Sequence, residues 1–135
     1  MVQGGSIIPT LRYDDGHAAI SWLCDMLGFE VKVSHSSEDK VYHAQLTIGH
    51  SMIMVSSRQD TSYDRLLIRP SDIDNQNTQG PYIFVTDLEK HYEHCLSKGA
   101  DIVLPMTTED HGSGYTIRDP EGHLWNIGDY NPWKN

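Results

Sequence analysis

Hydrophobic and polar residues alternate along the chain with two different periods, which predict helices in some segments and strands in others. Between Asp15 and Gly28, apolar residues lie three or four positions apart, as on one face of an amphipathic helix. The segment 41–48 instead alternates at every second position, which indicates a strand with one packed and one wettable face. The apolar positions of that strand are Ala44, Leu46 and Ile48, and the polar positions are His43, Gln45 and Thr47.

The order of the predicted elements is repeated about seventy residues later. In each half, a strand leads into an aspartate, a helix follows, a cysteine lies four residues before a glycine, and further strands come after it. Asp15 and Asp87 occupy the positions of helix N-caps, and Gly28 and Gly99 stand where a left-handed residue ends a helix. The duplication predicts two modules, each with the order βαβββ.

We expect an α+β fold in which both modules belong to a single domain, residues 1–135. Module one spans residues 6–56, a polar linker or lid spans 57–79, and module two spans 80–130. The predicted strands cover residues 7–13, 29–34, 41–48 and 51–55 in module one, and 83–85, 101–104, 115–118 and 123–128 in module two. With a helix on the outer face of each curved mixed sheet, the open faces are expected to line a cavity. The alternative is that each polar face meets bulk solvent.

Composition and charge exclude several kinds of partner. The net charge is −9 and the ten Lys and Arg residues are scattered, so nucleic acid is not an expected ligand. No apolar stretch approaches the roughly 18 to 20 residues of a membrane span, and the first residues lack a secretion signal. We therefore expect no membrane association and a cytoplasmic location. The two cysteines, Cys24 and Cys95, are expected to be free thiols.

Two segments resemble the vicinal-oxygen-chelate superfamily, which includes glyoxalase I, extradiol dioxygenases and bleomycin-resistance proteins. The first starts at residues 8–13, IPTLRY, and leads to LGFE at 27–30. The second and more specific segment is 112–128, with DPEGHLW at 119–125. The chain is thus similar over nearly its whole length to small glyoxalase-like members of bleomycin-resistance type. The resemblance implies the two-module fold and a homodimer.

The resemblance also implies where a divalent metal would be bound. Metal-dependent members are similar in carrying a histidine on an opening strand and a carboxylate on a closing strand, all facing the cavity. The opening-strand positions fall on Ile8 and Gly80, and the closing-strand positions fall near Met54 and on Asn126. None of these residues is a good ligand for a divalent metal of this class, so we expect no metal cofactor.

The cavity itself predicts a set of ligand-binding residues. Thr10, Arg12, His43 and Gln45 are expected on its polar wall, and Asn126 is expected to face them from module two. Arg12 suits a ligand carboxylate or phosphonate, although an ion pair with an acidic residue is an equal alternative. His43 is the candidate catalytic residue, because a histidine can exchange a proton near neutral pH; hydrogen bonding to a ligand is the favoured alternative.

Aromatic residues and histidines supply further candidates. Tyr115 and Trp125 are predicted to offer stacking surfaces to a planar ligand, with packing at a subunit interface as the alternative. His111 lies in a predicted polar loop, 106–113, near the mouth of the cavity. His91 and His94 are three apart on a helix, a spacing that can bind zinc, but a solvated helix face is favoured.

Two functions from different classes follow from these residues. The leading hypothesis is a metal-free protein that binds and sequesters a small, partly aromatic or amphipathic molecule. The alternative is an enzyme, a lyase, isomerase or dioxygenase, that uses His43 or a non-standard metal set of His43, His111 and His123. Aromatic and apolar walls would favour binding, and convergent titratable groups would favour catalysis.

Overall fold

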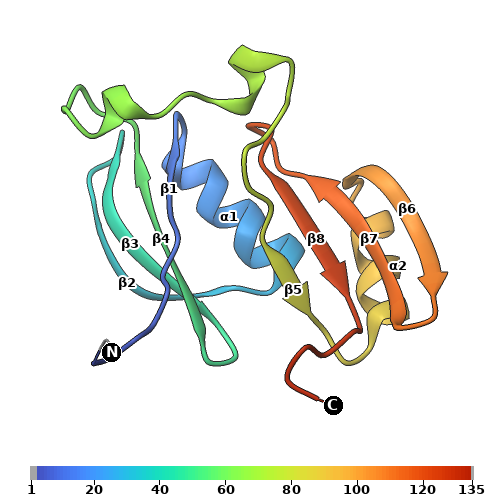
Figure 1. Cartoon of the computed structure of the whole chain (residues 1–135). Coiled ribbons are helices and arrows are strands. Elements are labelled where there is room, and N and C mark those ends of the chain that lie inside the picture. Colours follow the sequence, from blue (N-terminus) through green and yellow to red (C-terminus); the bar gives the residue numbers. More distant parts are fainter. Residues whose placement is uncertain (1–2, 135) are drawn as a thin grey trace. The chain divides into compact units, whose positions relative to one another are not determined.

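A computed structural model describes residues 3–134 and divides the chain into two compact units, with the boundary between Leu67 and Ile68. Each unit contains a four-stranded mixed sheet and one α-helix in the order βαβββ (Figure 1), which confirms the predicted α+β fold of two modules. The boundary falls inside the segment 57–79 that was expected to be a linker.

Module one begins with a short strand that pairs in parallel with the last strand of the same module. Its sheet has the order β1-β4-β3-β2, and Thr10 of β1 lies opposite Met54 of β4. The other two pairings are antiparallel. The elements are β1 (Thr10–Tyr13), α1 (Gly16–Leu27), β2 (Glu30–Ser36), β3 (Val41–Ile48), β4 (Ser51–Ser57) and the short 3-10 helix η1 (Asp64–Leu66).

Helix α1 has the caps and the core face that the sequence predicted. The Asp15 carboxylate accepts a hydrogen bond from the backbone N–H of Ala18 at 3.0 Å, and Gly28 ends the helix with φ of 84°. The helix packs against β1 and β4. Its contribution to the core comes mainly from Ala19, Leu23, Met26 and Leu27, while Trp22 is only half-buried.

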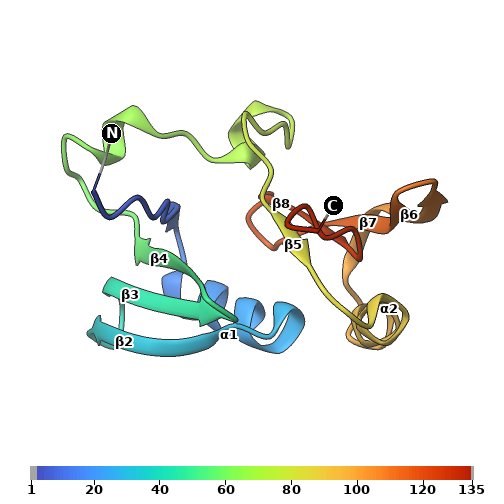
Figure 2. The same ribbon diagram turned by 60° about the horizontal axis from the view of Figure 1, so that its bottom comes forward.

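Module two repeats this plan with the sheet order β5-β8-β7-β6, and its helix lies on one face of the sheet (Figure 2). Tyr82 of the opening strand lies opposite Asn126 of the closing strand in a parallel pair. The elements are η2 (Pro70–Ile73), β5 (Tyr82–Phe84), α2 (Leu88–Ser97), β6 (Asp101–Glu109), β7 (Gly112–Arg118) and β8 (Leu124–Gly128).

The two sheets match position by position, which places equivalent residues at a nearly constant offset. Thr10 and Tyr82 are 82 − 10 = 72 residues apart, and their strand partners Met54 and Asn126 are 126 − 54 = 72 apart. On the third strands, Gln45 corresponds to Thr116 with an offset of 116 − 45 = 71. Each open face can therefore be compared with the other residue by residue.

Several predicted strands shift by one or two residues at their ends, and larger changes occur in three segments. The first strand begins at Thr10 instead of residue 7. The predicted loop 106–113 is a hairpin, because β6 continues to Glu109 and the turn at Asp110 and His111 leads directly into β7. Thr107 and Thr108, which are β-branched, pair there with Gly114 and Ser113. Segment 57–79 contains the two 3-10 helices.

Both Cys24 and Cys95 are free thiols, as predicted, and burial raises the pKa of each. Within residues 3–134, no helix has the length and apolar character needed to cross a membrane.

Candidate ligand-binding faces

The open face of module one carries the polar residues that the alternation predicted. Thr10, Met54 and Gln45 form one row across β1, β4 and β3. His43 lies two residues from Gln45 on the same face of β3, and a ring nitrogen of His43 is 3.2 Å from the side-chain nitrogen of Gln45. Both side chains are partly exposed. The structure thus brings Thr10, His43 and Gln45 to one face.

Arg12 is held on this face by a segment that the sequence did not assign to the site. Its Nε donates to Oδ1 of Asp64 at 3.0 Å, and its guanidinium lies 5.0 Å from the centroid of the Tyr63 ring. The Tyr63 hydroxyl is in turn 3.2 Å from the hydroxyl of Thr10. Of the two predicted roles for Arg12, the ion pair with an acidic residue is the one seen in the structure. The side chain of Arg12 is still 22% exposed.

The Asp64 carboxylate is the centre of this contact. It accepts hydrogen bonds from Arg12 and from the hydroxyl of Thr61, and its side chain is only 5% exposed. The Thr61 hydroxyl is the main cause of a lowered pKa for Asp64; partial burial opposes this effect, and the charge of Arg12 adds to it. We call residues 61–66 the strap, because these contacts fasten them to β1.

The open face of module two contains a pocket of about 340 Å³. A row of four paired residues crosses it from edge to edge of the sheet, in the order Tyr82, Asn126, Thr116 and Leu104. The lining also includes three further side chains, those of Thr107, Glu109 and His111, and the backbone of Gly112 and Gly114. Sequence reasoning found Asn126 but missed the other members of the row, because their side chains form no recognisable motif.

The Asn126 side chain makes two hydrogen bonds within its own module. Its Oδ1 accepts a hydrogen bond from the Thr116 hydroxyl at 2.8 Å, and its Nδ2 donates to the carbonyl of Pro81 at 3.3 Å. A side chain at Gly80 would meet Nδ2 at 3.0 Å. The positions at which metal-dependent relatives would hold a divalent ion thus carry Ile8, Gly80, Met54 and an occupied amide, a donor set that does not fit such an ion.

Tyr115 and Trp125 do not offer their rings to the open face, so their predicted stacking position is corrected. Trp125 is 1% exposed, and it lies on the opposite face of β8 from its neighbour Asn126. Tyr115 is 3% exposed and reaches the pocket only as part of its floor. Its hydroxyl contacts a ring nitrogen of His91 and lies 3.5 Å from the sulfur of Cys95. Both aromatic rings belong to the core under α2.

His91 contacts the Tyr115 hydroxyl and therefore faces the core of module two. Its ring is half-buried instead of solvated, and burial, with a smaller contribution from His94, lowers the pKa of His91. Burial likewise raises the pKa of Tyr115, and the Cys95 sulfur beside its hydroxyl adds to this effect. Apart from the spacing of the two histidines, no pattern in the sequence predicts this cluster.

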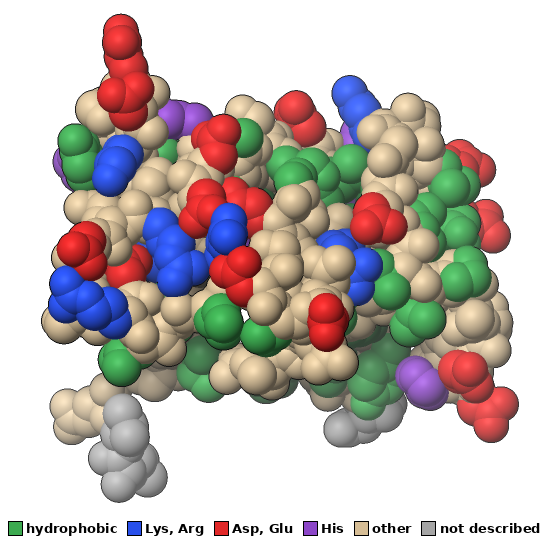
Figure 3. Space-filling view, turned by 90° about the horizontal axis from the view of Figure 1, so that it is seen from above, with side chains coloured by type: hydrophobic (Ala, Val, Ile, Leu, Met, Phe, Trp, Pro, Cys, Tyr) green, Lys and Arg blue, Asp and Glu red, His purple; other side chains and the backbone are tan. Residues whose placement is uncertain are grey.

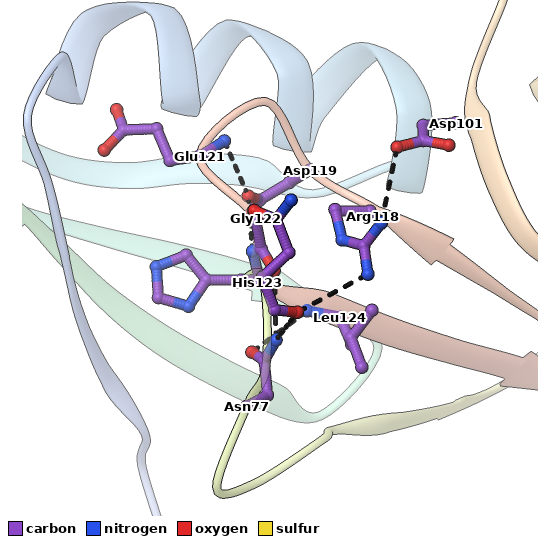
Figure 4. A network of polar contacts seen from close by, with 9 residues as sticks. Asn77, Asp101, Arg118, Asp119, Glu121, Gly122, His123 and Leu124 are labelled. Carbon is purple, nitrogen blue, oxygen red and sulfur yellow. Dashed lines mark hydrogen bonds and ion pairs between the residues drawn. The ribbon is translucent and has the colours of Figure 1, made fainter. Parts of the chain in front are cut away.

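A turn network fixes the start of β8 and explains the burial of Trp125. Oδ1 of Asp119 accepts hydrogen bonds at 3.0 Å from the backbone N–H groups of Glu121 and His123, and Oδ2 accepts one at 3.2 Å from the indole of Trp125. Figure 4 shows this turn together with Asn77, whose amide bonds to the backbone of Gly122 and Leu124. In the DPEGHLW segment, Asp119 therefore has a structural role: it holds the turn and the buried indole of Trp125.

The histidines proposed as an alternative metal set do not come together. His111 precedes the first residue of β7, and His123 follows the turn after its last residue, so the length of that strand, about 20 Å, separates them. Among residues 3–134, no three His, Cys, Asp or Glu side chains are grouped closely enough to hold a metal ion. A set that requires both His111 and His123 is therefore wrong.

Acidic and basic side chains are interspersed on the face of the molecule seen in Figure 3. Among the described residues, ion pairs join Arg65 to Asp60 at 2.8 Å and Arg69 to Asp72 at 3.0 Å. The basic residues on that face do not form a stripe of one sign, as binding to a phosphate backbone would require.

The fold and these faces define a protein of duplicated βαβββ modules with open sheets. Residues 7–127 match the family described as Glyoxalase/Bleomycin resistance protein/Dioxygenase superfamily, and the chain belongs to this superfamily. Comparison of the sequence with curated proteins finds no match. The match of residues 7–127 to this family confirms the predicted resemblance.

Solved structures show the same fold at low sequence identity. TioX from Micromonospora sp. ML1 is 24% identical, with a TM-score of 0.73 over 95% of this chain and 100% of that one. The bleomycin-binding protein from Streptomyces verticillus, solved with copper(II)-bleomycin, is 19% identical, with a TM-score of 0.61 over 94% and 97%. The fosfomycin resistance protein FosX from Listeria monocytogenes is 14% identical, with a TM-score of 0.69 over 98% and 97%.

Proposed function

We propose that this chain binds and sequesters a small, partly aromatic or amphipathic molecule on its open sheet faces without a metal cofactor. The observation that carries the proposal is the pocket of module two. Its volume of about 340 Å³ lies within the range of ligand sites. Its walls are aromatic and aliphatic, and its polar groups are hydroxyls, the amide of Asn126, the carboxylate of Glu109 and the ring of His111. No hydrogen bond joins Glu109 to His111 within the described residues, so the lining suits recognition better than proton transfer.

The similar structures support binding as the general activity. One of them is a bleomycin-binding protein seen with copper(II)-bleomycin, and another is a fosfomycin resistance protein. Both descriptions concern small bioactive molecules. At these identities the likeness extends to the fold, so the ligand of this chain has to be argued from its own residues.

The metal-free part of the proposal is tested directly by elemental analysis of protein purified without an affinity tag. Calorimetric titration with nickel, zinc, manganese and iron(II) then follows. We expect no stoichiometric metal and no saturable binding, because Asn126 is engaged and Ile8, Met54 and Gly80 supply no suitable ligand. One tightly held ion per chain would overturn this part and direct attention to metal-dependent chemistry.

Binding is tested with a chemically diverse set of small molecules, scored by the thermal unfolding midpoint. A ligand present at about 100 times its Kd stabilises the folded state by about 2.7 kcal/mol, which is readily measured. Hits are confirmed by calorimetry, and by mass spectrometry of the recovered ligand. A ligand recovered unchanged supports sequestration, whereas its conversion into a product supports an enzyme.

The second candidate function is an enzyme that uses His43. It is favoured by the position of His43 on the open face of module one, where the ring is partly exposed and contacts Gln45. Within the described residues, the one hydrogen bond of the His43 ring is to this amide, so no carboxylate orients it as in common acid–base pairs. Product formation that His43→Ala abolishes, without loss of ligand binding, would establish this function.

Homodimer formation and a cytoplasmic location are proposals that rest on the family resemblance and on the sequence. Light scattering coupled to size-exclusion chromatography measures the mass of the particle. A mass of twice the 15.3 kDa chain supports the dimer, and a mass of one chain contradicts it. Fractionation of cells that produce the protein from its own gene tests the location.

A further inference from the structure

The pocket of module two has the shape of a trough. Where they line the pocket, the two central strands carry nothing larger than an asparagine on the open face: Gly112, Gly114 and Thr116 on β7, and Asn126 on β8. Beyond this stretch, the paired residues Arg118 and Leu124 stand on the same face at the far end of the two strands. The edge strands carry Tyr82 on one side and Leu104 on the other, and both side chains are exposed. Three strand spacings separate these edges, about 14 Å, which is enough for a flat system of fused rings.

The floor is kept low by close backbone packing. A Cβ at Gly114 would lie 3.1 Å from the carbonyl oxygen of Ile127. A Cβ at Gly128 would lie 2.7 Å from the hydroxyl of Tyr82 and 3.0 Å from the carbonyl oxygen of Ser113. The Tyr82 side chain therefore lies against Gly128, and its hydroxyl donates to the carbonyl of Tyr130 at 2.7 Å. This hydrogen bond orients an aromatic ring that is 44% exposed.

One end of the trough is electronegative. Glu109 is an exposed carboxylate in the lining, and no Lys or Arg of the described residues lines the pocket with it. The Glu109 side chain makes no hydrogen bond or ion pair within the described part of the chain. His111, which also lines the pocket, stacks edge to face with Tyr130, with ring centroids 5.4 Å apart. A carboxylate next to exposed aromatic rings suits a cation.

We infer that the ligand of this trough is a flat aromatic molecule that carries a protonated amine. Its ring system lies on the glycine-rich floor between Tyr82 and Leu104, and its amine lies at the end formed by Glu109 and Tyr130. The inference rests on the proposed binding function and adds the ligand class. The net charge of −9 further favours a cation over an anion during the approach to the protein.

Three acridines with one ring system and different charges test the inference on the full chain. At mildly alkaline pH, 9-aminoacridine is a cation, acridine is neutral and acridine-9-carboxylate is an anion. Binding is followed by the fluorescence of the probes. We expect 9-aminoacridine to bind about fivefold more tightly than acridine, since an exposed ion pair contributes up to about 1 kcal/mol, and we expect the anion to bind most weakly.

Variants assign the effect to the trough. Glu109→Gln should reduce the preference for 9-aminoacridine over acridine to nearly one, and Asp110→Asn, with the same change of charge on the neighbouring exposed residue outside the lining, should preserve it. Tyr82→Ala should weaken both probes about tenfold. Tyr82→Phe keeps the ring if Tyr82→Ala fails to fold, as judged by circular dichroism, and should weaken both probes less.

The possible failures are distinguishable. Equal binding of the three probes, or a preference that Glu109→Gln leaves intact, overturns the cationic ligand class while binding itself stands. Binding of other compounds in the diverse set but of no acridine also overturns the inference and leaves the proposed function in place. The absence of any bound small molecule, under conditions where the protein is folded, overturns both.

Discussion

At the position where module one carries His43, module two carries Gly114, with an offset of 114 − 43 = 71. The two open faces differ in the same way at the next position along this face of the strand, where module one carries Gln45 and module two carries the smaller Thr116. In module one the strap holds Arg12, while His43 and Gln45 stay partly exposed; module two has a low floor and an open pocket. One backbone plan thus supports a face partly covered by its own chain and a face with an open pocket.

The cores differ as well, under the same helices. Ala44 in β3 corresponds to Tyr115 in β7, and Ala19 in α1 corresponds to His91 in α2, where 91 − 19 = 72. Module one fills this space with apolar contacts, and module two fills it with a polar cluster. The comparison teaches that the duplicated fold tolerates both solutions, provided that buried polar groups find partners.

The largest expected effect on stability is at the turn between β7 and β8. Among the described residues, the hydrogen bonds of Asp119 in this turn have no counterpart in the hairpin between β3 and β4 of module one. Asp119→Ala would leave two backbone N–H groups and the indole of Trp125 without their acceptor. We expect a loss of about 3–5 kcal/mol in the free energy of unfolding, measured in urea. His50→Ala, in the two-residue hairpin at the equivalent place of module one, should change it by less than about 0.5 kcal/mol. Similar losses in the two variants would contradict this difference.

Acidification should weaken module two through His91. Because its pKa is lowered in the folded state, the unfolded chain takes up the proton first, near the ordinary value of about 6.5. The stability therefore falls as the pH drops below about 6.5 and levels off below the folded pKa. Urea unfolding of the wild type and of His91→Gln from about pH 8 to about pH 5 measures the contribution. The variant should lose less stability over this range, and parallel curves would refute the role of His91.

The strap should respond in a different pH range. The pKa of Asp64 is lowered, so its contribution to stability is fully present above the unfolded value of about 3.9 and is lost as the pH falls through the folded value. Asp64→Asn should lower the thermal unfolding midpoint at neutral pH, and the difference from wild type should shrink below about pH 4. Asp60→Asn, which removes an exposed partner of Arg65, is the control and should have a smaller effect at neutral pH. Equal effects would contradict the assigned contact.

The smallest effect on stability is expected at His43. His43→Ala should change the free energy of unfolding by less than about 1 kcal/mol, because the side chain is partly exposed and its one hydrogen bond is to Gln45. Calorimetry with a verified ligand should nevertheless show altered binding. Thr47→Ala, farther along the same face of β3, is the matched control. An unchanged Kd for His43→Ala would count against a place for His43 in the ligand site.

Local patterns in the sequence predicted the modules, the caps and most strands. Asp15 and Asp87 predict the starts of their helices, because each carboxylate accepts a hydrogen bond from the backbone N–H only three residues later. The same reasoning failed for Trp125, although strand parity already places it on the opposite face from Asn126. Its burial follows from strand alternation and from Asp119, which is six residues away.

Contacts between distant positions account for what remained unpredicted. Arg12 and Asp64 are separated by 52 residues, and nothing in the composition of the strap marks which of the many acids pairs with this arginine. The pocket of module two depends on the difference in side-chain size between central and edge strands. Such a difference becomes visible only when the order β5-β8-β7-β6 is known.

The parallel pairing of β1 with β4 has a consequence for the growing chain. Thr10 cannot meet Met54 until 54 − 10 = 44 further residues have been added, which takes several seconds at roughly 5–20 residues per second. The antiparallel strands β2, β3 and β4 can pair as soon as each hairpin is complete. Residues 10–57 contain every strand of the first sheet, so that sheet can close while the second is still being translated. The duplication thus divides a slow, long-range folding problem into two shorter ones that are met in sequence on the ribosome.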